Sequence, residues 1–242
     1  MKGIILAGGK ATRLRPLTHI TSKQLLPVYN KPMIFYPLET LLKAGIKQIL
    51  IIVAPEYAGH FLKLLGSGKE WGAKFTYEIQ EEPRGLADAF NVGADFIGNN
   101  NVTMILGDNI FDHDFSKSIK GFKSGGKIFV KQVPDPERYG VIEFGDNNRV
   151  VSIEEKPKAP KSHFASVGLY IYDNRVVEFV KKLAPSQRHE LEITDLHKKY
   201  LELNELSVET FEGFWEDAGT FDSLLRANNY MAQKAHQQQT TL

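Results

Sequence analysis

Short apolar runs recur along the first half of the chain, and stretches with helical spacing separate them. The runs lie at residues 4–6, 48–54 and 102–106. An unbroken run of this kind is typical of a strand that is buried on both faces. Helical spacing covers residues 34–42, 56–65 and 85–96, and a strand-like alternation covers 75–79. Asn30 is the predicted N-cap of the first of these helices. This alternation predicts an α/β fold with a largely parallel sheet and helices on both faces.

The second half of the chain has strand patterns that suit antiparallel pairing. Residues 141–144 and 150–153 flank Gly145-Asp146-Asn147-Asn148, which is a strong hairpin signal. Further strands are predicted at 127–133, 164–172 and 206–211, and helices at 175–183, 195–203 and 220–235. We therefore expect a mixed, mostly parallel sheet of Rossmann-like type in a single domain, residues 1–242, with a ligand-binding lobe in its second half. The polar tail at 237–241 is expected to fray.

The composition excludes several classes of protein. Hydrophobic residues make up 42% of the chain and charged residues 24%, which predicts a packed core. A net charge of +1 gives no support for binding to nucleic acid or to a membrane surface. The absence of cysteine excludes disulfides and thiolate metal sites. The sequence shows neither a signal peptide nor an apolar run of bilayer length, so we expect a cytoplasmic protein.

A pair of glycines ends the first apolar run. Gly8 and Gly9 let the backbone turn sharply and bring its N–H groups close to a ligand. Arg13 and Lys23 follow, and these two side chains bind phosphate well. The spacing fits neither the P-loop nor the dinucleotide fingerprint. A plain turn would also explain the glycines alone, but the nearby cations favour a phosphate-binding loop.

Polar residues follow two other predicted strands of the parallel sheet. Gln80 ends the strand at 75–79, and Asp108 follows the run at 102–106. Ligands of such sheets bind beyond the carboxyl ends of the strands, so we expect both side chains to lie near the glycine loop. An unpaired carboxylate at the end of a buried strand would be costly, which favours a function for Asp108. Asp112 and Asp114 are expected on the loop surface or as caps of the next helix.

Several longer motifs occur in order along nearly the whole chain. They are residues 3–14, Ser22-Lys23-Gln24-Leu25-Leu26-Pro27-Val28, Lys31-Pro32-Met33-Ile34, Gly107-Asp108-Asn109-Ile110-Phe111, residues 135–141, Glu155-Lys156-Pro157, residues 190–195 and residues 215–220. In these motifs the chain resembles the sugar-nucleotide pyrophosphorylases, and most of all the members that use dTTP and glucose 1-phosphate. Several motifs in order are far more specific than any one of them.

This resemblance implies a reaction. The phosphate oxygen of α-D-glucose 1-phosphate attacks the α-phosphorus of dTTP in line, with Mg²⁺ present, to give dTDP-glucose and pyrophosphate. Two alternatives stay open: the same chemistry with UTP, and a non-catalytic sensor of sugar nucleotides. An oxidoreductase of Rossmann type is disfavoured because the dinucleotide fingerprint is absent.

The resemblance also assigns roles to individual residues, with the nucleotide bound by residues 1–125 and the sugar by about 126–225. The implied catalytic residues are Arg13, Lys23, Asp108 and Lys156. The implied nucleotide site comprises Leu6, Gly8, Gly9, Arg13, Gln80, Gly85 and Asp108. The implied sugar-phosphate site comprises Asn109, Tyr139, Gly140, Glu155, Lys156, Val167 and Trp215. Asp108 and Asp217 are the implied ligands of Mg²⁺, whose preference for oxygen ligands and retained waters suits two carboxylates beside phosphate oxygens.

The chain departs from the family pattern at a few positions. Ala11 and His189 stand where glycine is usual, and Ser166-Val167 replaces a typical Val-Thr pair. Longer relatives carry extra C-terminal helices that help to build a second nucleotide site for feedback by dTDP-rhamnose, and we expect no complete second site here. The resemblance further implies a homo-oligomer.

Overall fold

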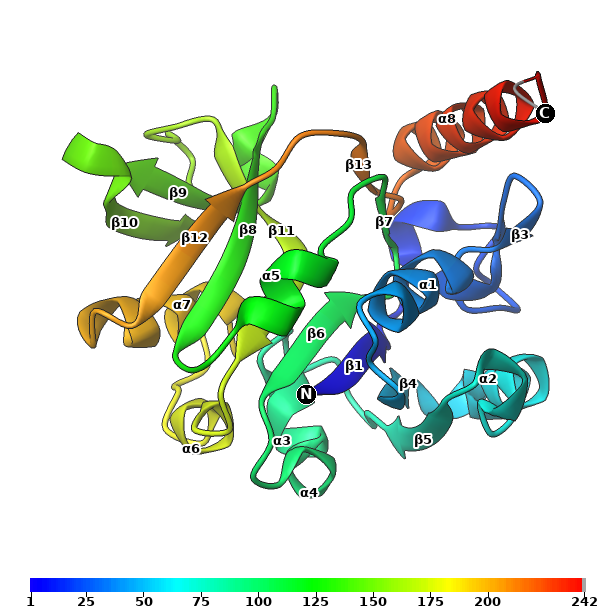
Figure 1. Cartoon of the computed structure of the whole chain (residues 1–242), viewed down its shortest axis with the longest axis horizontal. Helices are drawn as coiled ribbons and strands as arrows, with labels where there is room; N and C mark the ends of the chain where they lie inside the picture. Colours follow the sequence, from blue (N-terminus) through cyan, green and yellow to red (C-terminus); the bar gives the residue numbers. More distant parts are fainter. Residues whose placement is uncertain (241–242) are drawn as a thin grey trace.

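The computed structural model describes residues 1–240, and a mixed β-sheet forms its centre (Figure 1). The first half of the chain contributes four parallel strands to this sheet: β1 (Lys2–Ala7), β4 (Gln48–Val53), β5 (Lys74–Ile79) and β6 (Val102–Leu106). The sheet order is β10-β9-β11-β6-β1-β4-β5. The predicted α/β fold with a mostly parallel sheet is therefore confirmed.

The strand register brings the carboxyl ends of the parallel strands to one edge of the sheet. Ala7 pairs with Val53, Val53 with Ile79, and Leu6 with Leu106. The residues that follow these pairs leave the sheet at the same edge, and they include the glycine loop and Gln80. The apolar runs thus place the predicted polar residues together, as the rule for parallel sheets requires.

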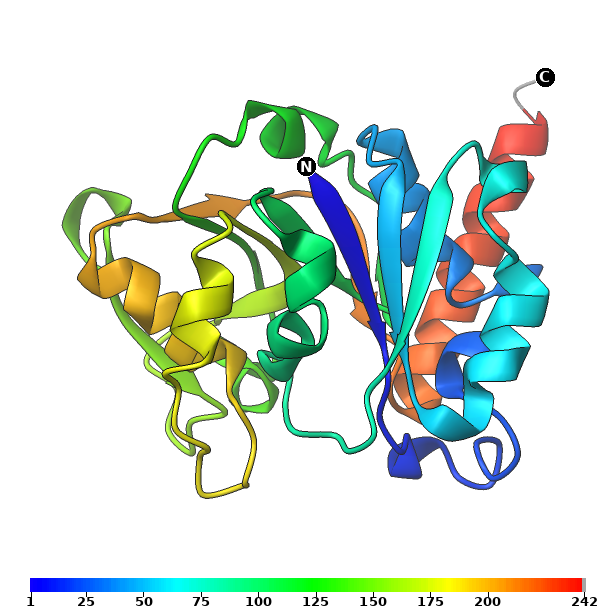
Figure 2. The ribbon, with the colours of Figure 1, turned by 90° about the horizontal axis from the view of Figure 1, so that it is seen from below.

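Helices cover both faces of the sheet (Figure 2). The helices α1 (Phe35–Lys43), α2 (Ala58–Leu65) and α5 (Ser116–Gly121) contribute to the core cluster on one face. The helices α3 (Asp88–Val92), α4 (Ala94–Ile97), α6 (Val176–Val180) and α7 (Ile193–Glu202) contribute to the cluster on the other. Within β1, Ile5 belongs to the first cluster and Ile4 to the second, so the strand is buried on both faces.

Antiparallel strands extend the sheet in the second half of the chain. The strand β11 (Phe164–Tyr172) pairs antiparallel with β6, with β8 (Gly126–Gln132) and with β9 (Gly140–Phe144). The predicted hairpin is confirmed as β9 and β10 (Val150–Glu155), and β12 (Leu206–Thr210) pairs parallel with β8.

Two small sheets lie beside the main one. The strand β7 (Asn109–Phe111) pairs antiparallel with β13 (Trp215–Asp217) and so joins segments more than a hundred residues apart. The hairpin of β2 (Pro27–Val28) and β3 (Lys31–Pro32) precedes α1. The last helix, α8 (Phe221–Thr240), follows β13. Among the described residues, no helix has the combination of length and apolar character that crossing a membrane requires.

Several predicted element boundaries were wrong. Asn30 does not cap α1, because the hairpin β2–β3 takes up this segment and the helix begins at Phe35 after Ile34. The helix predicted over 85–96 is split into α3 and α4 at Gly93, and it starts late because Gly85 has a left-handed backbone with φ of 102°. The helix α8 continues to Thr240 instead of ending near residue 235, and residue 241 lies outside the described residues.

Candidate active site

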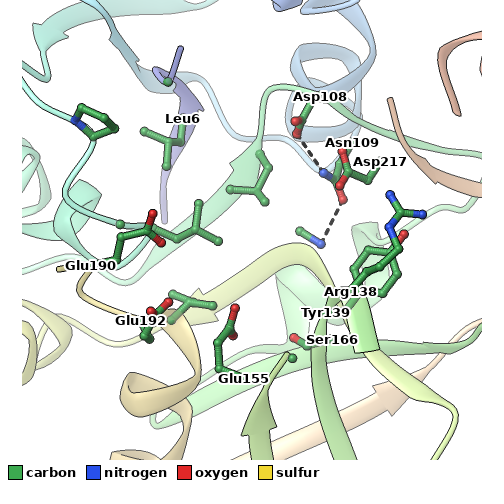
Figure 3. Close-up of a pocket in the computed structure, with 18 of the residues that line it drawn as sticks. Leu6, Asp108, Asn109, Arg138, Tyr139, Glu155, Ser166, Glu190, Glu192 and Asp217 are labelled. Carbon is green, nitrogen blue, oxygen red and sulfur yellow. Dashed lines mark hydrogen bonds between the residues drawn. The ribbon is translucent and has the colours of Figure 1, made fainter. Parts of the chain in front are cut away.

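A cavity of about 540 Å³ opens at the carboxyl edge of the parallel strands and extends over β9, β10 and β11 (Figure 3). All but one of the residues predicted for the site line this cavity. They are Leu6, Gly8, Gly9, Arg13, Lys23, Gln80, Gly85, Asp108, Asn109, Tyr139, Gly140, Glu155, Lys156, Trp215 and Asp217. Residues from both halves of the chain therefore share one pocket.

Val167 is the exception, because its side chain does not line the cavity. Side chains alternate along a strand, so neighbouring residues of β11 point to opposite faces. Ser166 and Gly168 line the cavity, whereas Val167 is fully buried in the apolar cluster on the other face. The sequence motif located the correct strand, but the side chain that faces the pocket is that of Ser166.

The glycine loop has the sharp backbone turn that its sequence predicts. Gly9 has φ of 98°, and Ala11 is left-handed with φ of 45° and ψ of 40°. The Thr18 hydroxyl donates a hydrogen bond of 2.8 Å to the Ala11 carbonyl and holds this turn. A 3₁₀ turn over Thr12–Leu14 follows and carries Arg13 to the cavity.

Replacing Ala11 with glycine should stabilise the protein slightly. A residue with a Cβ atom loses about 1–2 kcal/mol of stability in a left-handed conformation, and glycine avoids this cost. Glycine also raises the conformational entropy of the unfolded chain, which cancels about 0.4–1 kcal/mol of the gain. We expect a net gain of about 0.5 kcal/mol, which is a rise in Tm of about 1–2 °C. The same substitution at Ala94, which lies in α4, should instead lower Tm. Calorimetry of both variants tests this, and a lower Tm for Ala11→Gly would contradict it.

Lys23 and Asp108 form a partly buried ion pair at one end of the cavity. Burial alone would lower the pKa of the Lys23 ammonium, but the Asp108 and Asp217 carboxylates together outweigh burial and the pKa is raised. Burial alone would raise the pKa of Asp108, and the Lys23 charge instead holds it below its ordinary value. Both groups therefore carry full charge at neutral pH.

Asp217 lies beside this pair because β13 is paired with β7. Asp217 stands opposite Asn109, and the N–H of Ala218 donates to the carbonyl of Asp108 at 3.0 Å. The Asp217 atom Oδ1 is buried and accepts no hydrogen bond. Burial, followed by the Asp108 charge, raises the pKa of Asp217 to about 6. A bound cation would stabilise an unpartnered carboxylate oxygen that lies next to a second carboxylate, because it would offset their mutual repulsion.

Gly219 lets Arg13 approach this carboxylate. A Cβ atom at Gly219 would lie 2.8 Å from Oδ1 of Asp217 and 2.9 Å from Nη2 of Arg13. Any side chain here would displace both groups. No cluster of three or more His, Cys, Asp or Glu side chains occurs among the described residues. A divalent cation held by Asp108 and Asp217 would therefore complete its shell with water or with substrate oxygens.

Asn109 connects the carboxylates to the far side of the pocket. Its Nδ2 donates to Oδ1 of Asp108 at 3.0 Å. Its Oδ1 accepts from Nε1 of Trp215 at 2.7 Å and from the N–H of Gly168 at 3.0 Å. The Trp215 ring in turn packs against Tyr139 with ring centroids 5.3 Å apart. One asparagine side chain thus fixes an aspartate, a tryptophan and the strand β11 relative to one another.

Charged groups gather at the opposite end of the cavity. Oε1 of Glu155 lies 3.1 Å from Nη2 of Arg188 and 3.7 Å from Nζ of Lys156. Burial raises the pKa of Glu155 in spite of these two cations. Arg188 also bonds to Glu192 at 2.7 Å. Lys156 is left-handed with φ of 44°, a strained state that is concentrated at functional sites.

Several residues that line the cavity were not predicted from the sequence. They are Pro83, Leu86, Leu106, Arg138, Ser166, Gly168, Tyr170, Arg188, Glu190, Glu192 and Ile193. Arg188 stands two positions before the motif at 190–195, so extending that motif would have found it. His189, the other departure from glycine, is left-handed with φ of 58°, and it turns the chain between Arg188 and Glu190.

Two further carboxylates follow Asp108, and of these Asp114 lies at the start of the next helix as expected, whereas Asp112 bonds to α8 instead. Asp114 accepts a hydrogen bond of 2.9 Å from the N–H of Ser116 at the start of α5. Asp112 accepts hydrogen bonds from Tyr230 and Lys234 on α8. The helix α8 is also joined to the β2–β3 hairpin, where the N–H of Tyr29 donates to Oδ1 of Asn228 at 2.7 Å.

Comparison with known proteins agrees with this geometry. The family model described as nucleotidyl transferase matches residues 2–234. The chain belongs to this family. A glucose-1-phosphate thymidylyltransferase of Neisseria meningitidis is 54% identical to this nucleotidyl transferase over 237 residues, which is 96% of this chain and 82% of the relative. One of Mycolicibacterium smegmatis is 51% identical over 236 residues, again 96% and 82% of the two chains.

Solved structures show the same fold. A Bacillus anthracis protein assigned as a glucose-1-phosphate thymidylyltransferase and solved with sucrose has a TM-score of 0.91 and 45% identity, covering 95% of this nucleotidyl transferase and 94% of that chain. A UDP-glucose pyrophosphorylase solved with UDP-glucose has a TM-score of 0.84 at 24% identity, covering 96% and 98% of the two chains. The second likeness concerns the fold alone.

Proposed function

We propose that this nucleotidyl transferase joins dTTP and α-D-glucose 1-phosphate to give dTDP-glucose and pyrophosphate. The observation that carries the proposal is the arrangement of charge in one cavity, with Arg13, Lys23, Asp108 and Asp217 at one end and Glu155, Lys156 and Arg188 at the other. Such a cavity suits two anionic substrates side by side. The names of the relatives at 51–54% identity support the same reaction.

The reaction requires positioning and charge compensation more than proton transfer. A sugar phosphate is already an anion, so its oxygen can attack the α-phosphorus without a general base. Arg13 and Lys23 would hold the triphosphate and stabilise the negative charge on the leaving pyrophosphate. Lys156 would bind the phosphate of the sugar and direct its oxygen in line.

Asp108 and Asp217 would hold Mg²⁺ in this scheme. The buried, unpartnered Oδ1 of Asp217 and the adjacent Asp108 carboxylate fit such an ion. The ion would neutralise charge on the phosphate oxygens. Asn109 keeps Asp108 in place, and Gly219 leaves room for Arg13 beside Asp217.

The substrates would divide between the two halves of the chain, at about residues 1–125 and 126–225. Leu6, Gly8, Gly9, Gln80 and Gly85 would surround the nucleotide. In the same scheme the residues around the glucose 1-phosphate would be Asn109, Tyr139, Gly140, Glu155 and Trp215. We place the reaction in the cytoplasm, where nucleoside triphosphates are available, and propose a homo-oligomer on the family resemblance.

The test measures pyrophosphate release from glucose 1-phosphate and Mg²⁺ with each of dTTP, UTP, CTP, ATP and GTP. We expect release with dTTP, and release with UTP would show that the enzyme accepts both bases. Binding of dTDP-glucose without release from any of the five nucleotides would favour the sensor and overturn the proposal.

A further inference from the structure

A single hydrogen bond sets the orientation of the Gln80 side chain. Nε2 of Gln80 donates to Oδ2 of Asp88 at 3.1 Å. A carboxylate can only accept hydrogen bonds, so the nitrogen end of the amide must face Asp88. The other end, Oε1, faces Gly8, because a Cβ atom added to Gly8 would lie 3.0 Å from it. Both Gln80 and Gly8 line the cavity.

Asp88 is an unusual residue to find at this place. Its exposed fraction is 7%, and among the described residues no cation forms an ion pair with it. Its second oxygen accepts from Nδ2 of Asn91 at 3.2 Å. A buried carboxylate without a cation is costly even when hydrogen-bonded. Among the described residues, the hydrogen-bond donors to the Asp88 carboxylate are thus two side-chain amides, those of Gln80 and Asn91.

We propose that Asp88 is a positioning residue, which makes the enzyme select thymine and uracil against cytosine through the orientation of Gln80. The inference rests on the proposed function and on Gln80 reading the base. Thymine and uracil present an N3–H donor, whereas cytosine presents an acceptor at N3. With Oε1 turned towards the base, the first two bases complete a hydrogen bond. Cytosine in the same pose would place its N3 acceptor opposite Oε1 of Gln80, which is also an acceptor, so no hydrogen bond could form.

Free rotation of the Gln80 amide would remove this discrimination. If the side chain turned over, Nε2 would face the base and could donate to N3 of cytosine. Asp88 prevents this turn because Oε1 would then face a carboxylate. The methyl group of thymine has no part in the contact, so this device does not separate dTTP from UTP.

A structural role is the competing explanation. Asp88 is the first residue of α3, where a negative charge interacts favourably with the helix dipole. Such a role would affect stability, but it would not change which base is used. The ratio of activities between two bases therefore separates the explanations.

The test compares kcat/KM for dTTP, dCTP, UTP and CTP in the wild type and in Asp88→Asn. Asparagine offers both a donor and an acceptor, so Gln80 can take either orientation. We expect the dCTP/dTTP and CTP/UTP ratios to rise at least about tenfold, in line with the discrimination that one base contact supplies. KM for glucose 1-phosphate should change less than twofold. Asp88→Glu keeps an acceptor-only side chain and should retain the low ratios.

Asp95→Asn is the matched control. Asp95 is an exposed carboxylate in the first turn of α4, so the chemical change is the same and the ratios should stay at the wild-type value. If Asp88→Asn does not fold, Asp88→Ser replaces it, because a hydroxyl can donate or accept and no longer fixes the Gln80 amide, so both ratios should again rise. Unchanged ratios in the folded variant would overturn the inference. Absence of pyrophosphate release by the wild type with dTTP would overturn the proposed function instead.

Discussion

Asp108→Asn should lower kcat/KM at least about a hundredfold without unfolding the protein, the loss that follows removal of one preorganised electrostatic group. Asp108 is the point where three parts of the site meet. It pairs with Lys23, accepts a hydrogen bond from Asn109 and lies beside the Asp217 carboxylate. Asparagine has nearly the same shape but no charge. The substitution would free Lys23 from its partner and remove one of two anionic ligands for a cation.

The measurement is pyrophosphate release under saturating Mg²⁺, with thermal unfolding followed in parallel. Asp114→Asn supplies the control, because Asp114 is exposed and contacts Ser116 and Lys43 instead of the cavity. Its activity should stay within twofold of the wild type. A fully active Asp108→Asn variant would show that Asp108 is not needed for the reaction.

Acidification from pH 7 to pH 4 should remove about 3 kcal/mol of stability through His197 alone, at 1.36 kcal/mol for each unit of pKa shift. His197 is fully buried on α7, and neither ring nitrogen has a hydrogen-bond partner. Burial lowers its pKa from 6.5 to about 3. Below pH 6.5 His197 is protonated in the unfolded chain, whereas in the folded protein it stays neutral until the pH approaches 3. The contribution is therefore complete above pH 6.5 and is lost as the pH falls towards 3.

His197→Phe isolates this effect, since an apolar ring fits the surrounding rings of Tyr170 and Tyr172. Chemical denaturation at pH 7 and pH 4 should show a smaller pH dependence of the unfolding free energy in the variant, by about 3 kcal/mol. The same substitution at His60, which is exposed on α2, should leave the pH dependence unchanged. An identical loss on acidification in His197→Phe and wild type would rule out His197 as its source.

The parallel half of the fold could be predicted from the sequence because its signals are local. Unbroken apolar runs such as the one in β1 identify buried strands, and the rule for parallel sheets then brings Gln80 and Asp108 to one edge. The ends of helices were harder to predict. Gly93 divides α3 from α4, and a glycine within a helical pattern is compatible with both a break and an unbroken helix.

The finer contacts of the site depend on distant segments. Lys23 meets Asp108 across 85 positions, and Asn109 bonds to Trp215 across 106. A motif can place such residues in one site, but it cannot show which atom bonds to which. The position of Val167 illustrates the limit, because a shift of one residue along a strand moves a side chain to the opposite face.

The contacts of α8 extend the set of positions at which a mutation can affect catalysis. Tyr230 and Lys234 hold Asp112, and Asp112 follows directly on β7, the strand that begins with Asn109. A substitution of Tyr230 or Lys234 would therefore disturb Asp112, which follows the strand that carries Asn109 to the cavity. Random mutagenesis screened for activity would recover changes in this helix as well as in the cavity, although neither Tyr230 nor Lys234 lines it.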